Sequence, residues 1–390
     1  MKKHLLKSKF FWLAIAVALV PAVVFGINTI NEGFKVDSET AREIDATSVG
    51  GPCKYVTNDS VTNDYFVPTK TATEWNSFIA NPPTGVVITG CIGSVITYSG
   101  PTDDIPRAIA YDGTNMWVAN NDATNSITKI SSSGAMTGYT LNGWGNNRYP
   151  TDIAFDGTNL WTANENSDTV TKVATNGSLV AEYNIGLEPF AITYGGGYMW
   201  TANTFDESVF RVTLTGTPML IDLAGYKPNA LAHDGTYLWV ATSNSPAIVK
   251  ISNLGSVLAT YPLVTAPTDI VNAGSYLWMT YGSGHGHVTR MTKSTGTTTN
   301  FTIILNDYWA NALAYDNTDI WTTAQSFAAG HGLIRVTSTG TATEYIDPAF
   351  SSSPVDIAFD NSTSMWTVNT DGSVSKMVVK YPGGGGAGLE

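Results

Sequence analysis

Seven tryptophans recur at nearly regular intervals in this chain, each within a copy of one short phrase. Their spacings are 44, 39, 39, 39, 43 and 45 residues, and they are Trp117, Trp161, Trp200, Trp239, Trp278, Trp321 and Trp366. A period of about 40 residues with strand-like content is typical of arrays of small β-sheets. We therefore expect an all-β fold, a seven-bladed β-propeller with four strands in each blade.

The second copy shows how one repeat divides into four strands. Two short apolar runs within residues 150–164 flank a turn at 156–159, where Gly takes positive φ and Asp and Asn bond nearby backbone. Runs at 169–173 and 179–185, separated by an Asn-Gly turn, predict a hairpin. One four-stranded sheet cannot bury both faces, so the copies must stack, and the recurring tryptophan is predicted to fill the space between neighbouring sheets.

The ends of the repeat array indicate how the ring closes. The last copy stops at Pro382 without a fourth strand, whereas residues 93–99, upstream of the first copy, match the fourth-strand pattern of residues 177–183. We expect this N-terminal strand to complete the last blade, which removes two exposed sheet edges. The propeller is therefore predicted to span residues 93–382, followed by a Gly-rich tail at 383–390.

The N-terminal 27 residues have the pattern of a targeting segment. Residues 1–9 are basic and residues 10–27 are almost wholly apolar, as in a secretory signal peptide or an uncleaved membrane anchor. Basic residues before the apolar run place the rest of the chain outside. We expect a secreted or cell-surface protein, held in the membrane through residues 10–27 if they are not removed, with residues 28–52 as a polar linker.

The two cysteines, Cys53 and Cys91, bound a separate segment. Two cysteines in an exported chain most often pair, so we expect a disulfide that closes a small cap over residues 53–92. Within it, residues 71–79 combine a capping box with apolar residues at helical spacing, which predicts one short helix. A separate binding module is the alternative to a cap.

The net charge of the chain restricts the classes of partner that it can bind. The formal net charge is −12, and four lysines lie within the first nine residues, so the body of the chain is still more acidic. An acidic body without a basic stripe argues against nucleic acid. We expect a monomer that binds a glycan, polymer or protein.

Two sets of side chains on the loops near the channel mouth are candidate metal ligands. His285, His287 and His331 lie in equivalent loops of adjacent repeats, where they could meet at a transition metal or belong to flexible surface loops. Three acids share one register before the first strand of their repeats and could bind a divalent cation or satisfy backbone N–H groups: Asp152, Asp269 and Asp356. No cofactor is specified by these patterns; Mg²⁺, Ca²⁺ and Zn²⁺ are the candidates.

A third set is suited to sugars. Aromatic rings can stack on a sugar while amides bond its hydroxyl groups; the candidates are Trp144, Tyr149, Tyr308, Trp309, Asn164 and Asn203. The alternatives are that the rings pack over blade ends and that the asparagines, which recur after the tryptophan strand, cap loop backbone.

The phrase Pro-x-x-Ile-Ala-x-Asp-Gly-x-x-Leu-Trp, as at residues 150–161, resembles repeats of the virginiamycin B lyase-like propellers, and is similar to the YVTN and NHL repeat groups. The resemblance covers residues 93–381 and implies a seven-bladed propeller. It also implies an activity that uses histidine and acid residues with a magnesium ion on one face. Where those lyases often read Leu-Trp-Phe-Thr-Glu, this chain reads Leu-Trp-Thr-Ala-Asn, and Glu165 stands near the expected acid. The catalytic candidates are then Glu165, His285, His287 and His331.

Two functions follow from these observations. The first is a non-enzymatic, surface-displayed binding module, because no nucleophile motif, zinc-protease motif or Gly-rich phosphate loop is present. The alternative is a metal-dependent enzyme, a carbon–oxygen lyase of the streptogramin-lyase kind or a hydrolase, that uses the channel-mouth face.

Overall fold

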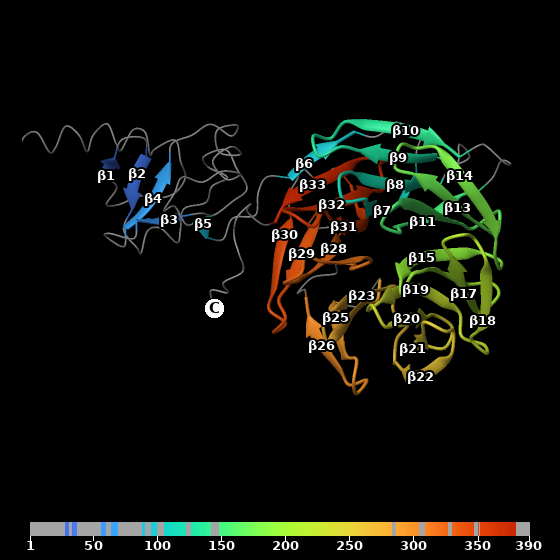
Figure 1. The fold of residues 1–390 in the computed structure, drawn as a ribbon. Coiled ribbons are helices and arrows are strands. Elements are labelled where there is room, and N and C mark those ends of the chain that lie inside the picture. Colours follow the sequence, from blue (N-terminus) through green and yellow to red (C-terminus); the bar gives the residue numbers. More distant parts are fainter. Residues whose placement is uncertain are drawn as a thin grey trace, which may run out of the picture. The chain divides into compact units, whose positions relative to one another are not determined.

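A computed structural model of the chain shows seven four-stranded antiparallel sheets arranged in a ring (Figure 1). It describes residues 95–99, 105–121, 126–141, 148–282, 286–303, 309–326, 330–346, 350 and 352–379, and the strand backbones β1 to β5 before them. These residues form no helix, and hence none that could cross a membrane. The predicted signal or anchor at 10–27 and the tail at 383–390 lie outside the described residues.

Each blade has four strands, as predicted, and the first strands of neighbouring blades contact one another at the centre of the ring. Blades 1 to 4 consist of β7 (Pro106–Tyr111), β8 (Met116–Asn120), β9 (Ser126–Ile130) and β10 (Met136–Thr140); β11 (Pro150–Phe155), β12 (Asn159–Asn164), β13 (Thr169–Ala174) and β14 (Leu179–Asn184); β15 (Pro189–Gly195), β16 (Tyr198–Asn203), β17 (Ser208–Thr213) and β18 (Pro218–Asp222); and β19 (Pro228–His233), β20 (Tyr237–Thr242), β21 (Ala247–Ser252) and β22 (Val257–Pro262). Blades 5 to 7 consist of β23 (Asp269–Ala273), β24 (Tyr276–Thr280), β25 (His287–Thr292) and β26 (Thr298–Thr302); β27 (Leu313–Tyr315), β28 (Ile320–Ser326), β29 (Gly330–Val336) and β30 (Ala342–Ile346); and β31 (Pro354–Phe359), β32 (Ser364–Asn369), β33 (Val374–Val378) and β6 (Val95–Tyr98).

The N-terminal strand β6 closes the ring, which confirms the prediction from the repeat ends. It lies beside β33 as the outer strand of blade 7. The Thr97 and Ser375 hydroxyls are 2.8 Å apart, and the Tyr98 ring stacks on Trp366 with centroids 5.9 Å apart. The first strand of blade 7 contacts that of blade 1, so the inner strands form a complete circle.

The seven recurring tryptophans are all buried, at 0–2% exposure, which confirms their predicted place between sheets. Trp161 shows the pattern: it packs with Met199 and Val212 of the next blade. Its indole N–H donates to Asp156 Oδ2 over 2.7 Å. The other oxygen of Asp156 accepts two backbone N–H groups of its own turn, so one carboxylate fixes both the turn and the ring.

A second set of contacts joins blade 2 to blade 3 and was not predicted. Lys172 Nζ lies 5.0 Å from the Trp161 ring and donates to the Leu214 carbonyl oxygen of blade 3 over 2.9 Å. Gly216 has a φ of 92° and lies against the Tyr183 ring of blade 2, where a Cβ would overlap the ring. The tryptophan, the cation, the fourth-strand aromatic ring and the glycine therefore form one inter-blade lock.

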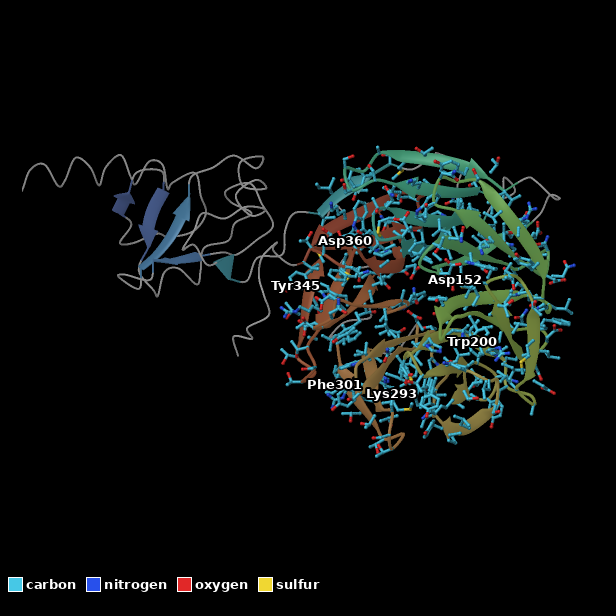
Figure 2. The ribbon with its side chains drawn as sticks, in the orientation of Figure 1. Asp152, Trp200, Lys293, Phe301, Tyr345 and Asp360 are labelled. Atoms are coloured by element: carbon cyan, nitrogen blue, oxygen red, sulfur yellow. The ribbon has the colours of Figure 1, made fainter. Side chains whose placement is uncertain are left out.

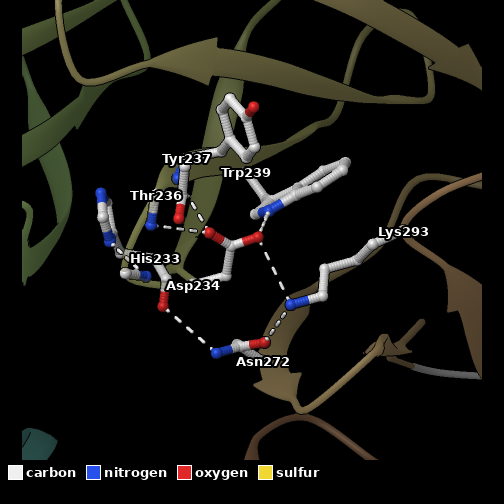
Figure 3. A network of polar contacts seen from close by, with 8 residues as sticks. His233, Asp234, Thr236, Tyr237, Trp239, Asn272 and Lys293 are labelled. Atoms are coloured by element: carbon white, nitrogen blue, oxygen red, sulfur yellow. Dashed lines mark hydrogen bonds and ion pairs between the residues drawn. The ribbon is translucent and has the colours of Figure 1, made fainter.

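The junction of blades 4 and 5 carries an additional ion pair (Figure 3), between the turn after the first strand of blade 4 and the turn after the third strand of blade 5. Lys293 Nζ lies 3.3 Å from Asp234 Oδ2 and donates to Asn272 Oδ1 over 2.9 Å. Burial acts to raise the pKa of Asp234, but hydrogen bonds from Trp239, Tyr237 and Thr236 and the charge of Lys293 outweigh burial and lower the pKa. The carboxylate thus stays ionised at a blade junction.

The chain divides into two compact units. One is built on Ile96–Asn361 and Met365–Lys376, and the other on Met1–Val95 with Ser362–Ser364 and Met377–Glu390. The N-terminal part has a five-stranded sheet in the order β1 (Asn28–Ile30), β2 (Gly33–Val36), β4 (Asp64–Pro68), β3 (Val56–Asp59) and β5 (Ile88–Thr89). Residues 28–52, expected to be a linker, therefore contain two of these strands. Cys53, Cys91 and the predicted helix at 71–79 lie outside the described residues.

Candidate functional site

The channel mouth is lined by residues from every blade. A cavity of about 340 Å³ opens there, and the side chains that follow the first proline of a repeat, or the equivalent position, line its rim: Arg107, Thr151, Phe190, Asn229, Thr268, Asn311 and Val355. In blades 1, 2, 3, 4 and 7 this residue is the extra residue of a β-bulge. A bulge turns a side chain out of the regular alternation, which brings one residue of each bulged blade to the cavity.

Polar side chains of this rim also donate hydrogen bonds to the next blade. The Thr151 hydroxyl donates to the Pro189 carbonyl oxygen of blade 3 over 3.1 Å. Asn229 Nδ2 donates to the Pro267 carbonyl oxygen of blade 5 over 2.6 Å. These side chains are consequently held in place, so the lining is a preformed surface.

The three acids predicted as a metal site directly follow the rim residues of blades 2, 5 and 7 in the sequence. Their carboxylates line the cavity, and Asp152 lies towards the middle of the ring in Figure 2. Each Oδ2 accepts a backbone N–H from the first strand of the following blade, over 2.7–2.8 Å: Ile192 for Asp152, Leu313 for Asp269 and Ile109 for Asp356. The acids thus fasten blade 2 to 3, blade 5 to 6 and blade 7 to 1, which is the backbone role left open by the sequence.

Burial weakens the acidity of these three carboxyl groups. It raises the pKa of Asp152 well above its usual range, that of Asp269 to about 7 and that of Asp356 to about 6. Repulsion from Asp356 adds to the rise for the other two, and repulsion from Asp269 adds to that for Asp152. The three groups therefore influence one another electrostatically across the cavity.

The described residues contain no group of three or more His, Cys, Asp or Glu side chains that could hold one metal ion. His287 packs on Tyr281, with ring centroids 5.1 Å apart, and His331 Nδ1 lies 3.4 Å from the Ser353 hydroxyl. His285 lies outside the described residues. Metal binding by the histidines stays a prediction.

The recurring asparagines are buried in hydrogen bonds. Asn164 is 0% exposed and donates to the Thr169 and Thr171 hydroxyls over 3.0 and 2.8 Å. Asn203 is equally buried and donates to the Gly186 carbonyl oxygen over 2.6 Å. This geometry favours the loop-capping role over contact with a ligand.

The remaining candidates lie at loop ends. Tyr149 and Glu165 are half-buried and come together on blade 2, where the Glu165 N–H donates to the Tyr149 carbonyl oxygen over 3.3 Å. Trp309 is half-buried and pairs through its backbone with Gln325. Trp144 and Tyr308 lie outside the described residues, so sugar binding by the aromatic set stays a prediction.

Sequence reasoning missed three exposed apolar side chains on the channel-mouth side of blade 3, Leu187, Phe190 and Phe205, which we call the blade-3 patch. These side chains are 41%, 41% and 62% exposed. The Thr204 N–H donates to the Glu188 carbonyl oxygen over 3.1 Å, which sets their two loops side by side. Aligning the residue after each proline would have shown Phe190 as an apolar member of a mostly polar ring.

Comparison with protein families gives a match to the virginiamycin B lyase family over residues 100–377. Comparison with curated proteins gives no match. Among solved structures, virginiamycin B lyase from Staphylococcus aureus is 21% identical, with a TM-score of 0.65, and the match covers 74% of this chain and 99% of that one. A catalytically inactive form of that enzyme with quinupristin is also 21% identical, with a TM-score of 0.64 and coverage of 74% and 100%.

A third solved structure is YCF48 bound to D1 peptide, which is 13% identical, with a TM-score of 0.60 and coverage of 73% of this chain and 97% of that one. At such identities these likenesses show the propeller fold and nothing further.

Proposed function

Since this chain belongs to the virginiamycin B lyase family, and since residues from every blade line a cavity at the channel mouth, we propose that it is a ligand-binding propeller. The partner is a polymer, glycan or protein that docks on this face. The carrying observation is the preformed cavity, whose volume of about 340 Å³ lies within the range of ligand pockets. Two solved propellers of this fold hold an antibiotic and a peptide.

The location outside the membrane is part of the same proposal. It rests on the basic residues 1–9 and the apolar residues 10–27, which direct export.

Binding arrays test this proposal. The full chain is applied to glycan and peptide arrays beside two variants of matched chemistry, Phe190→Ser at the cavity and Leu258→Ser on the outer strand β22, where Leu258 is 51% exposed. We expect bound spots that are lost with Phe190→Ser and kept with Leu258→Ser. Spots that survive both changes, or an absence of spots, would contradict docking at the channel mouth. Glycan spots unaffected by Trp144→Ala and Trp309→Ala would remove the aromatic set from the site.

Family membership favours a second function, a metal-dependent carbon–oxygen lyase or hydrolase. Incubation of quinupristin with the chain and Mg²⁺, followed by chromatographic separation and tandem mass spectrometry, tests it. An elimination product keeps the mass of the substrate, whereas hydrolysis adds one water. Metal analysis of the chain and of His285→Ala, His287→Ala and His331→Ala identifies the ligands. Unchanged quinupristin and no bound metal would leave the binding function alone.

A further inference from the structure

The blade-3 patch opens directly onto the channel cavity. Phe190 belongs to both, because it lines the cavity and is 41% exposed. Leu187 is fixed beside the loop of Phe205 by a hydrogen bond from its N–H to Asp206 Oδ2 over 2.6 Å. Exposed apolar side chains clustered at the edge of a pocket are typical of a surface that another molecule covers.

The loops around this patch are acidic. Five acids and no Lys or Arg occur in the channel-mouth loops of blades 2 and 3, within 164–168, 185–189 and 203–208: Glu165, Asp168, Glu188, Asp206 and Glu207. The described cations of this face with some exposure, Arg107 and Lys227, belong to blades 1 and 4, and Arg107 also lines the cavity. A partner that covers the patch therefore meets negative charge on the surrounding loops.

The acids inside the cavity are already engaged. Both oxygens of Asp152 and of Asp269 accept backbone N–H groups, and burial raises the pKa values of both carboxyls. The basic group of a partner is therefore attracted by the acids of the loops around the patch.

We infer that the channel mouth takes a polypeptide segment in which a lysine or arginine lies next to an apolar residue. The basic side chain lies against the acidic loops at the cavity mouth, and its apolar neighbour covers the blade-3 patch. This inference rests on the proposed binding function and adds the chemistry of the partner. Charge complementarity of this kind sets which partner is accepted and speeds its approach.

Selection from random peptides displayed on phage, with the full chain as bait, tests the inference. We expect the selected peptides to be enriched in Lys or Arg flanked by apolar residues. Replacing that Lys by acetyl-lysine in a synthetic copy removes the charge and keeps the stem, and should weaken binding by about tenfold. This change is made in the peptide, so it does not depend on how a protein variant folds. Phe190→Ser should weaken the same peptides and Leu258→Ser should not.

The outcomes separate the two proposals. Peptides that depend on Phe190 but lack basic residues, or that tolerate acetyl-lysine, would overturn the basic-partner inference and leave the binding function standing. If glycans bind through Phe190 and no peptide does, the basic-partner inference is likewise overturned and the binding function still stands. If neither a peptide nor a glycan binds in a way that depends on Phe190, both proposals are contradicted.

Discussion

At the scale of single residues, two glycines with the same backbone conformation should respond very differently to a methyl group. Gly177 and Gly157 have φ values of 85° and 93°. A Cβ on Gly177 would overlap the Tyr139 ring, whereas a Cβ on Gly157 would meet nothing within 4 Å. Left-handed backbone costs an L-residue about 1–2 kcal/mol, and overpacking adds about 1–3 kcal/mol. We expect Gly177→Ala to lower the free energy of unfolding by about 2–5 kcal/mol and Gly157→Ala by only about 1–2 kcal/mol, as measured by urea denaturation. Equal losses would mean that the aromatic–glycine contact does not stabilise the blade junction.

Asp269 should make the fold less stable as the pH rises. Burial raises its pKa to about 7 in the folded chain, against about 3.9 in an unfolded one. Between these values the folded chain keeps a proton that the unfolded chain loses, so stability falls as the pH rises from about 4 to 7. Asp269→Asn does not titrate, so its stability relative to the parent should increase across this window by about 1–4 kcal/mol. Thermal unfolding at a series of pH values measures the difference. Asp356→Asn should show a smaller change that ends near its own pKa of about 6; a flat difference for both would show that these carboxyls do not titrate abnormally.

At the scale of elements, blades 4 and 5 are joined by the Lys293–Asp234 ion pair, in which both side chains are at most 16% exposed. Lys293→Met should leave the carboxylate short of its cation and cost about 1–3 kcal/mol at neutral pH. Because the pKa of Asp234 is lowered by its partners, this contribution is present above the unfolded pKa and is lost as the pH falls through the folded one. A double-mutant cycle with Asp234→Asn isolates the pair; additive losses would show that the two groups act independently.

The elements also show what the sequence can and cannot predict. The four strands of blade 2, the buried tryptophans and the closing strand β6 follow from local periodicity and turn residues, and all were predicted. The rim of the cavity was not, because a bulge reverses the direction in which residues such as Thr151 and Asn229 point. The lock between Lys172 and the Leu214 carbonyl joins groups that are 42 residues apart, and no local pattern reports such a contact. The two roles offered for Asp152 could be weighed only once the N–H of Ile192 was seen within reach.

At the scale of the whole molecule, ring closure depends on a strand that lies outside the matched family region. That region begins at residue 100, whereas β6 ends at Tyr98. A chain that begins at residue 100 loses the Tyr98–Trp366 stacking and the Thr97–Ser375 contact, and exposes the edge of β33, which can pair with other chains. We expect it to unfold at a lower temperature than a chain that begins at residue 93, and to associate in size-exclusion chromatography. Because only the missing strand distinguishes the two, a synthetic peptide of residues 93–99 should restore part of the thermal stability of the shorter chain and return it to the monomer position. Identical melting curves for the two chains, with no response to the peptide, would mean that three strands suffice for blade 7 and that the ring is stable without β6.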